Sequence, residues 1–392
     1  MTFTDANKEC SYLRGYRSLR ALQQFRDWRL SLWLIAVKLV RSQLTCLNDA
    51  LLHDRQSRLS FSSGPSPATA DMTTVSEQEY EILTKDNGNL WDQLRELINT
   101  QRWTTQDHAT LSLLQEMPNV VNLFITRKSD NFLLGAVILI ETQENILGNV
   151  YVMREGYRAS GMGMKLVRMF MKILHKSFTE KPFLARGVPA MMGKYAGPPF
   201  YATHAYELYS YEFTDKKDLK DFFPAPASHP YRIVSVKDLT PRQFHQMIEY
   251  DKMVTGVDRT KFLTEYYSID FVKGIVAFDS NNQIRGMAGL VPTTYEDGLF
   301  KLNPIYAENI DDASTFVHAV ADQTNHPNAH FVLHTRTASA GDWMLKKCKD
   351  TNRKMNMVGV LCNATNLNQI YKDPSRTDLM FSPTNSPAHF DG

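Results

Sequence analysis

The pattern in this 392-residue chain most suited to chemistry lies between positions 150 and 166, with the sequence VYVMREGYRASGMGMKL. An apolar, β-prone run ends near Met153, and a polar connection leads to Arg158-Ala-Ser-Gly161-Met-Gly163 at the start of a helical pattern. Glycines let a backbone turn tightly and approach a ligand without a Cβ in the way. The first amides of a helix lack intrahelical partners and carry a partial positive charge, which suits a pyrophosphate. The segment therefore predicts a phosphate-binding turn, with a glycine-rich turn that holds no ligand as the alternative.

Two common nucleotide-binding motifs do not fit this turn. A Rossmann fingerprint needs a third glycine and a parallel βαβ unit, with an acidic residue about twenty positions further on. A P-loop needs a Gly-Lys-Ser/Thr sequence, which this segment lacks. The turn is therefore assigned to neither class.

The elements around the turn form a pattern that repeats. Three β-prone runs, 120–126, 131–141 and 146–153, lead into a helical pattern over 162–177 and a further strand over 183–188. Three prolines within 223–230 then exclude regular structure, and a similar order of strands and helices follows over 231–392. The sequence predicts an α+β protein with domains at 72–222 and 231–392, joined by the proline-rich linker 223–230.

The first 71 residues differ from the rest. Between Cys10 and Asn48 there are seven basic residues and one acidic residue, with apolar residues at roughly helical spacing. This pattern fits a mitochondrial transit segment, a membrane-surface helix, or a helix docked on the protein, and Met72 is an alternative start. Asp5 and Glu9 disfavour a transit segment. Residues 60–70 are rich in Ser, Pro and Ala, which predicts a flexible linker.

Composition excludes several classes of protein. Apolar residues make up 43% and charged residues 22%, which is typical of globular chains. The 44 basic and 42 acidic residues give a net charge of +2, which argues against nucleic acid as a partner. The longest apolar run, 30–40, contains Lys38 and is about half as long as a membrane span, so no stable membrane insertion is predicted. The four cysteines share no close spacing, which predicts neither a metal site nor disulfides and favours a cytoplasmic location: Cys10, Cys46, Cys348 and Cys362.

The turn resembles the acetyl-CoA-binding loop of the GNAT N-acetyltransferases, whose pattern is Arg/Gln-x-x-Gly-x-Gly/Ala between a strand and a long helix. The resemblance covers about residues 75–213 and includes the order of the strands. It implies two tandem GNAT-like domains, each a mixed, mostly antiparallel sheet flanked by helices. It also implies that main-chain groups of Val152 and Met153 hold the pantetheine of acetyl-CoA. The amides implied to hold the pyrophosphate belong to Arg158, Ala159, Ser160, Gly161, Met162, Gly163 and Met164.

The same resemblance implies direct attack of an amine on the thioester, assisted by a base and by an acid that protonates the leaving thiolate. The acid in the family is often a helical tyrosine five residues before the aromatic of a Tyr-x-x-x-Gly-Phe sequence. Tyr201 has this spacing to Tyr206, although Ala205 replaces the glycine, so Tyr201 is the candidate acid and a packing role is the alternative. Candidate bases, acting through water, are Glu141 and Glu144; the nearby histidine, His204, is more typical of a structural residue.

Residues 231–392 are similar to the YitH/HolE-type acetyltransferase-like domain that follows a first GNAT domain. The similarity is carried by the segment 250–263, by Gly286-x-x-Gly289, and by 302–307. Gly256 is predicted to end a helix and Asp258 to cap the next one. Arg259 either pairs with a buried carboxylate such as Asp251 or faces a substrate cleft. Residues 304–309 stand where the glycine-rich loop belongs and offer fewer amides, which predicts one acetyl-CoA per chain.

Three functions stay open from the sequence. The first is transfer of an acetyl group from acetyl-CoA to a primary amine of a small molecule or a protein. The second is a catalytically silent tandem GNAT-like protein that binds CoA or a partner, because the base and the Gly-Phe motif are altered. The third is transfer of a longer acyl chain, which a pocket beside Val137, Leu139 and Met153 would decide. The acceptor and the oligomeric state are not determined, and a mitochondrial location requires residues 10–48 to act as a transit segment.

Overall fold

The computed structural model describes residues 79–142, 145–197, 200–364 and 375–384, all within one compact unit of the chain. The predicted N-terminal amphipathic segment, the linker over 60–70 and the candidate base Glu144 lie outside these residues. None of the helices within the described ranges has the length and apolar character needed to cross a membrane.

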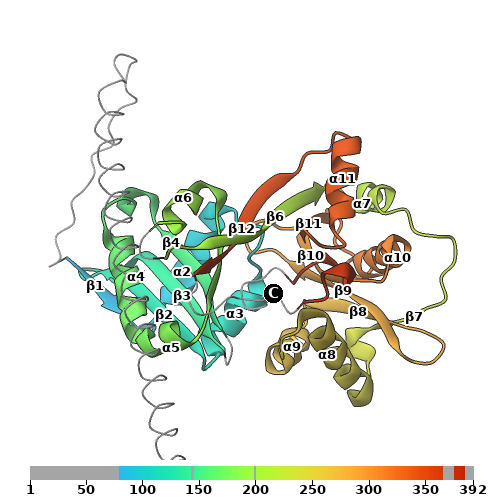
Figure 1. Ribbon diagram of the computed structural model, residues 1–392, viewed down its shortest axis with the longest axis horizontal. Helices are drawn as coiled ribbons and strands as arrows, with labels where there is room; N and C mark the ends of the chain where they lie inside the picture. The colour runs from blue at the N-terminus through green and yellow to red at the C-terminus, as the bar shows by residue number, and fades with distance from the viewer. Residues whose placement is uncertain (1–78, 143–144, 198–199, 365–374, 385–392) are drawn as a thin grey trace, which may run out of the picture. The chain divides into compact units, whose positions relative to one another are not determined.

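The described residues contain thirteen strands in one mixed sheet (Figure 1). Their order across the sheet is β1-β2-β3-β4-β5-β12-β6-β11-β10-β9-β8-β7, and β13 pairs with β10 beside this path. The strands are β1 Tyr80–Leu83, β2 Val120–Arg127, β3 Phe132–Glu141, β4 Ile146–Met153, β5 Phe183–Gly187, β6 Thr203–Phe213, β7 Arg232–Ser235, β8 Lys273–Phe278, β9 Ile284–Pro292, β10 Leu299–Tyr306, β11 His330–Arg336, β12 Asn356–Ala364 and β13 Met380–Ser382.

Two strands are exchanged between the two halves of the sheet. β12 comes from the end of the chain, yet it lies between β5 and β6 of the first half and pairs antiparallel with both. In return, β6 lies between β12 and β11 of the second half. In Figure 1 these two long strands cross from one half of the sheet to the other. The segments predicted as separate domains therefore share one continuous sheet.

Only two strand pairs in the described part of the sheet are parallel, β4 with β5 and β10 with β11. They occupy equivalent places in the two halves, since each joins a run of antiparallel strands to the exchanged pair. Each parallel crossover contains a long helix, α4 after β4 and α10 after β10. The predicted α+β class, with a mixed and mostly antiparallel sheet, is confirmed.

Helices cover both faces of the sheet. Buried residues of α2 and α3 pack on one face of β2–β5, and those of α4 pack on the other. In the second half α7, α10 and α11 cover one face, while α8 and α9 cover the other. The helices are α2 Leu90–Gln101, α3 His108–Glu116, α4 Met162–Ile173, α5 His175–Glu180, α6 Met192–Tyr195, α7 Lys216–Phe222, α8 Pro241–Thr255, α9 Thr260–Ser268, α10 Ile310–Ala321 and α11 Asp342–Asp350.

The ends of the second half's helices follow their local sequence. The Thr240 hydroxyl accepts a hydrogen bond from the Gln243 backbone amide, and the Gln243 side-chain oxygen accepts one from the Thr240 backbone amide, which is a capping box. Gly256 ends α8 at a φ of 71°, which confirms the predicted helix end. The Asp258 carboxylate accepts a hydrogen bond from the Thr260 amide, but the N-cap residue of α9 is Arg259, so Asp258 lies one residue before the predicted cap position. Side-chain and backbone bonds of Thr260 lower the pKa of Asp258 to about 2.

Candidate functional site

A large cavity opens where β4 and β5 separate. The two strands pair only over Ile146–Gly148 and Phe183–Ala185, and beyond these residues the edge of β4 has no strand partner. The cavity has a volume of about 1060 Å³ and is lined from both layers of helices. Val167 of α4 lines it on one side and the α2–α3 loop, Gln101–Gln106, on the other. The cavity therefore passes through the gap in the sheet.

A β-bulge shapes β4 at the point where the strands part. The register shifts so that Val150 lies opposite Ile138 and Gly148 opposite Leu139, which leaves Asn149 as the extra residue. Asn149 lines the cavity, and both heteroatoms of its side-chain amide are buried without a hydrogen-bond partner among the described residues. An unsatisfied buried amide is costly, so this site favours a bound polar group.

The glycine-rich turn lies at one end of the cavity. A 3₁₀ turn, Glu155–Tyr157, leads into it, and Gly161 has a φ of 83°, a left-handed conformation that glycine adopts without strain. Helix α4 begins at Met162, so its first amides lie next to this turn. Arg158 bridges the turn to two other elements: its Nε donates to the Met153 carbonyl at 3.2 Å and its Nη2 to Gln101 at 2.6 Å.

The glycine at the second helical position allows close packing. A Cβ on Gly163 would lie 2.4 Å from the hydroxyl oxygen of Tyr151, which lines the same cavity. Burial raises the pKa of Tyr151. A glycine is needed here because the tyrosine packs directly on the first turn of α4.

The second half of the chain holds the α2–α3 loop in place. Lys301 of β10 is fully buried, and its Nζ lies 2.5 Å from the Asp107 carboxylate and 3.0 Å from the Thr105 carbonyl. His334 of β11, also fully buried, lies 2.9 Å from the Thr104 hydroxyl through its Nε2. Burial lowers the pKa of both Lys301 and His334. This anchoring was not foreseen from the sequence, since no local pattern links residues about 200 positions apart.

Comparison with known proteins shows a similarity over part of the chain. Residues 247–363 match the model of the acetyltransferase (GNAT) domain. The match includes β12, whose Met357 and Gly359 line the cavity described above.

One curated protein and several solved structures are similar to most of the chain. An uncharacterized protein of Caenorhabditis elegans is 26% identical over 329 residues, which covers 81% of this chain and 100% of that protein. The crystal structure of a candidate acetyltransferase from Pyrococcus horikoshii superposes with a TM-score of 0.56 at 14% identity, covering 79% of this chain and 95% of that one. A tandem GNAT protein from the clavulanic acid biosynthesis pathway has a TM-score of 0.52 at 13% identity, covering 73% and 98%. The fold is therefore similar to that of a tandem GNAT protein.

Most of the residues predicted to hold the cofactor meet at this GNAT cavity. Its lining includes Val152, Met153, Arg158, Ala159, Gly161, Gly163 and Met164. Ser160 and Met162 do not line it. The Ser160 hydroxyl donates to the Tyr157 carbonyl at 2.6 Å, and Met162, the first residue of α4, is buried in the core under that helix. Both still belong to the turn, where they fix its shape.

The segment around the predicted acid has a different structure from the expected helix. Tyr201 lies in a loop before β6 with 66% of its surface exposed, and it is not part of the cavity lining. Tyr206 lies on β6, buried, with its ring 3.8 Å from the Arg336 guanidinium. The strand forms because residues 203–213 alternate between the two faces of the sheet and pair with β11 and β12.

A different tyrosine lines the cavity. Tyr195 ends the short helix α6 and packs edge-on against Phe200, with ring centroids 6.1 Å apart. Burial raises the pKa of Tyr195 to about 12, so its hydroxyl keeps its proton at neutral pH. Sequence reasoning missed it, although Tyr195 precedes Phe200 by the same five residues that separate Tyr201 from Tyr206.

Glu141, the predicted base that lies within the described residues, does not line the cavity. Glu141, at the end of β3, accepts hydrogen bonds from Ser177 at 2.5 Å and Lys181 at 2.9 Å, which lower its pKa. His204 is exposed on β6 and lies outside the lining. No aspartate, glutamate or histidine lines the cavity among the described residues.

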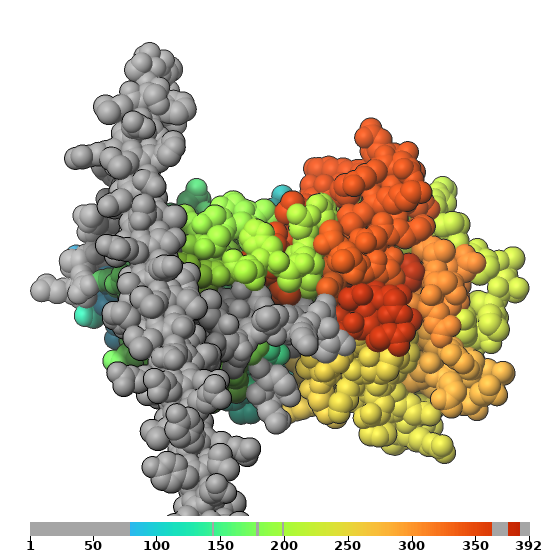
Figure 2. Space-filling model, viewed as in Figure 1, coloured from blue at the N-terminus to red at the C-terminus, as the bar shows by residue number. Residues whose placement is uncertain are grey.

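The equivalent gap in the second half is closed. Strand β13 pairs with β10 at Ile305 and Tyr306, and the Thr335 hydroxyl of β11 donates to the Phe381 carbonyl at 2.9 Å. The strand therefore lies where a cofactor would enter. In Figure 2 the red segment 375–384 lies between orange-red α11 and the yellow helices α8 and α9. The next helix, α10, has Asp311 and Asp312 in its first turn, and its N-terminus is capped by the Asn309 side chain. Both features disfavour binding of a phosphate at this helix end.

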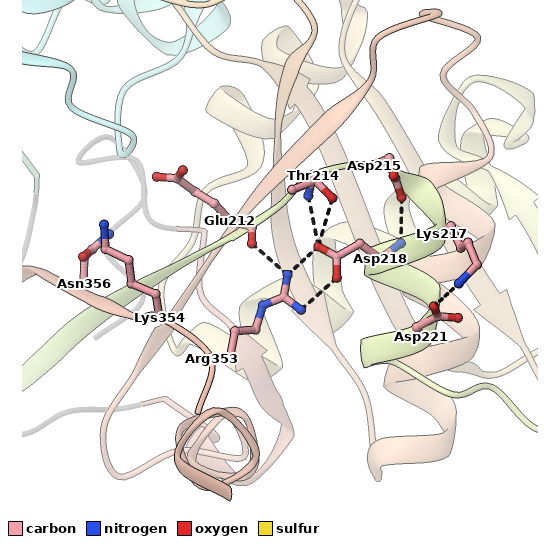
Figure 3. A pocket seen from close by; sticks show the side chains of 9 residues that line it. All are labelled: Glu212, Thr214, Asp215, Lys217, Asp218, Asp221, Arg353, Lys354 and Asn356. Atoms are coloured by element: carbon pink, nitrogen blue, oxygen red, sulfur yellow. Dashed lines mark hydrogen bonds and ion pairs between the residues drawn. The ribbon is translucent and has the colours of Figure 1, made fainter. Parts of the chain in front are cut away.

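Two other polar groupings have structural roles. Arg259 donates to Asp251 at 2.9 Å in a pair that is almost fully buried, so the predicted buried partner is confirmed and the cleft alternative is not. A hollow on the surface beside α7 is lined by charged and polar residues, several of which bond to one another (Figure 3). There Arg353 binds both the Asp218 carboxylate and the Glu212 carbonyl, which joins α7 to the segment after α11.

Proposed function

We propose that this protein transfers an acetyl group from acetyl-CoA to a primary amine. The observation that carries the proposal is the cavity between the parted strands β4 and β5, with the Gly161 turn and the start of α4 at one end. Pantetheine would lie along the unpaired edge of β4, near Val152 and Met153. The pyrophosphate would accept hydrogen bonds from the turn and the first amides of α4.

The chemistry follows from the order of the groups along the cavity. The amine nitrogen attacks the thioester carbonyl, the C–N bond forms and the C–S bond to CoA breaks. The buried hydroxyl of Tyr195 is the proposed proton donor to the departing thiolate. Because no described carboxylate or imidazole lines the cavity, the amine proton leaves to solvent through water. The rate should then rise with pH through the pKa of the acceptor amine.

One acetyl-CoA per chain is the proposed stoichiometry. The second half has a strand in place of the cofactor groove and two aspartates at the start of its equivalent helix. Its proposed contribution is structural: β12 closes one side of the cavity, and Lys301 and His334 hold the loop on the other side. A cytoplasmic location is part of the proposal.

Calorimetric titration of acetyl-CoA into the full chain tests this function. Three variants separate the causes of any loss. Gly161→Glu adds a carboxylate at the pyrophosphate, Gly161→Ala adds the backbone strain without charge, and Gly156→Glu adds the same charge at a position with open space around it. We expect one site per chain, lost only in Gly161→Glu and retained, if weakened, in Gly161→Ala.

Two outcomes of this titration would contradict the proposal. Binding of two molecules per chain would contradict the single cofactor site. No binding to folded protein would contradict the enzyme and would favour the silent tandem GNAT-like alternative. Release of the CoA thiol in the presence of amines then measures the transfer itself.

A further inference from the structure

The charge around the cavity has one sign. Its described lining includes four basic side chains and no acidic one; the basic residues are Arg102, Arg158, Arg186 and Lys194. Arg158 belongs to the glycine-rich turn, where the pyrophosphate is proposed to bind. Arg102 has 75% of its side chain exposed and lies 3.5 Å from the carboxylate of Glu296. Lys194, on the short helix α6, is exposed. Arg186 is therefore the basic residue that remains to be explained within the cavity wall.

Arg186 lies on the face of the sheet opposite to α4, the helix proposed to bind the pyrophosphate. Along β5 the side chains alternate, with Ala185 packed in the cluster of α4 and Leu184 in the cluster of α2 and α3. Arg186 therefore shares the face of Leu184, the face that the α2–α3 loop covers. Its Nη2 lies 3.5 Å from the hydroxyl of Tyr206, whose ring contacts a second guanidinium, that of Arg336.

Neutral hydrogen-bonding groups line the same cavity. Both heteroatoms of the Asn149 amide and the Oε1 of Gln106 are buried and have no partner among the described residues. Gln106 is only 1% exposed, so its side chain has little access to solvent outside the cavity. Two amide oxygens and an amide nitrogen are therefore available to a ligand that also meets a guanidinium.

We propose that the acceptor is a small amine that carries an anionic group, either a carboxylate or a phosphate. This inference rests on the acetyltransferase function proposed above. Arg186 binds the anionic group, because a guanidinium matches carboxylate and phosphate oxygens with two parallel N–H donors. The amide groups of Asn149 and Gln106 orient the amine. A polyamine or a lysine-rich peptide would instead bring positive charge against Arg186 with no described carboxylate in the lining to balance it.

Matched pairs of acceptors test the inference on the full chain with acetyl-CoA. Glycine is compared with glycinamide, phosphoethanolamine with ethanolamine, and spermidine serves as the polycation; CoA release is measured with the mass of the product. We expect the anionic member of at least one pair to have a kcat/KM at least about tenfold higher, which corresponds to about 1.4 kcal/mol. Which pair shows the preference distinguishes a carboxylate from a phosphate.

Variants connect that preference to the residue. Arg186→Gln should remove the preference for the anionic acceptor and leave the Kd of acetyl-CoA unchanged. Arg186→Lys, which keeps the charge but not the paired donors, should retain part of it. Arg102→Gln removes an equal charge from the exposed edge of the cavity and should keep the preference.

Several results would overturn the inference. These are equal or faster reaction of the neutral amines or spermidine, an equal loss for both members of a pair in Arg186→Gln, or bound acetyl-CoA with no acceptor in the panel acetylated. Acetyl-CoA binding is measured first by calorimetry. A folded protein that does not bind it would overturn the proposed function, and this inference with it.

Discussion

At the scale of single residues, two tyrosines with the same sequence spacing differ in their access to the cavity. Tyr195 lines it and is half-buried, whereas Tyr201 lies outside it and is mostly exposed. If Tyr195 protonates the thiolate, Tyr195→Phe should lower kcat by about 100-fold and leave the Kd of acetyl-CoA unchanged. Tyr201→Phe is the matched control and should change neither. A larger loss of kcat in Tyr201→Phe would return the role to the residue chosen from the sequence.

Gly163 offers a test of packing at the start of α4. A Cβ there would lie 2.4 Å from the Tyr151 hydroxyl oxygen but 3.3 Å from the ring carbon that carries it. Gly163→Ala should destabilise the fold by about 1–3 kcal/mol through overpacking and weaken acetyl-CoA binding. The double variant Gly163→Ala/Tyr151→Phe removes the clashing oxygen and should recover most of both losses. Urea unfolding and calorimetry measure them, and an absence of recovery would show that the clash lies elsewhere.

His334 predicts a pH dependence of stability. Burial holds its pKa well below the ordinary value of 6.5, so the folded state stays unprotonated where the unfolded chain takes up a proton. Stability should therefore fall as the pH drops below 6.5, by up to about 1.4 kcal/mol per pH unit, and level off below the folded pKa. His334→Gln should flatten this slope in urea unfolding between pH 7 and 5. The exposed histidine variant His204→Gln should leave the slope unchanged.

The residues that could be found from the sequence are those with local signals. Gly161 and Gly163 are recognisable because the strand, the turn and the helix that need them are adjacent in the chain. Tyr195 and Tyr201 could not be separated, since both precede an aromatic by five residues and only the path of the chain decides which faces the cavity. Asn149 and Arg186 carry no local signal at all, because their roles depend on neighbouring strands.

At the scale of elements, the α2–α3 loop depends on a buried ion pair from the other half of the sheet. Lys301→Met would leave the Asp107 carboxylate buried and unpaired, which should cost about 3–5 kcal/mol in unfolding free energy. Adding Asp107→Asn removes the unpaired charge but keeps an acceptor for the Thr110 amide at the start of α3, so it should restore part of the stability.

The same pair of variants tests what the loop does. In the double variant the loop loses the hydrogen bond from Lys301 to the Thr105 carbonyl. We expect a higher KM for the acceptor with an unchanged Kd for acetyl-CoA, because the loop lines the side of the cavity opposite to α4. An equal weakening of both ligands would show a general loosening of the cavity.

Elements were predictable where their pattern was periodic and their partners close. The bounds of β4 and the end of α8 at Gly256 agree with the sequence expectation, because a β-prone run and a glycine mark them. The family resemblance implied a helix around Tyr201, but the segment after it forms β6, because its side chains alternate and its backbone pairs with β11 and β12. β12 and β13 were not predicted, and their places in the sheet depend on strands more than 70 residues away.

At the scale of the whole molecule, exchange of β6 and β12 makes the halves depend on each other. Without β12, the edges of both β5 and β6 would lose a partner, and without β6 the same holds for β11 and β12. The second half closes its own cofactor gap, yet it supplies one wall of the cavity in the first. Residues of both halves therefore line the same cavity.

This dependence predicts a single unfolding transition for the described unit. Phe316→Ala, in the core under α10, and Leu94→Ala, in the core under α2, each remove a fully buried side chain and should cost about 2–5 kcal/mol. Because β6 and β12 join the two cores, each variant should speed amide hydrogen exchange in both β3 and β9 to a similar extent. In urea, acetyl-CoA binding should be lost at the same denaturant concentration as the circular dichroism signal. If Phe316→Ala affects β9 and leaves β3 protected, the halves unfold independently and the exchanged strands do not couple them.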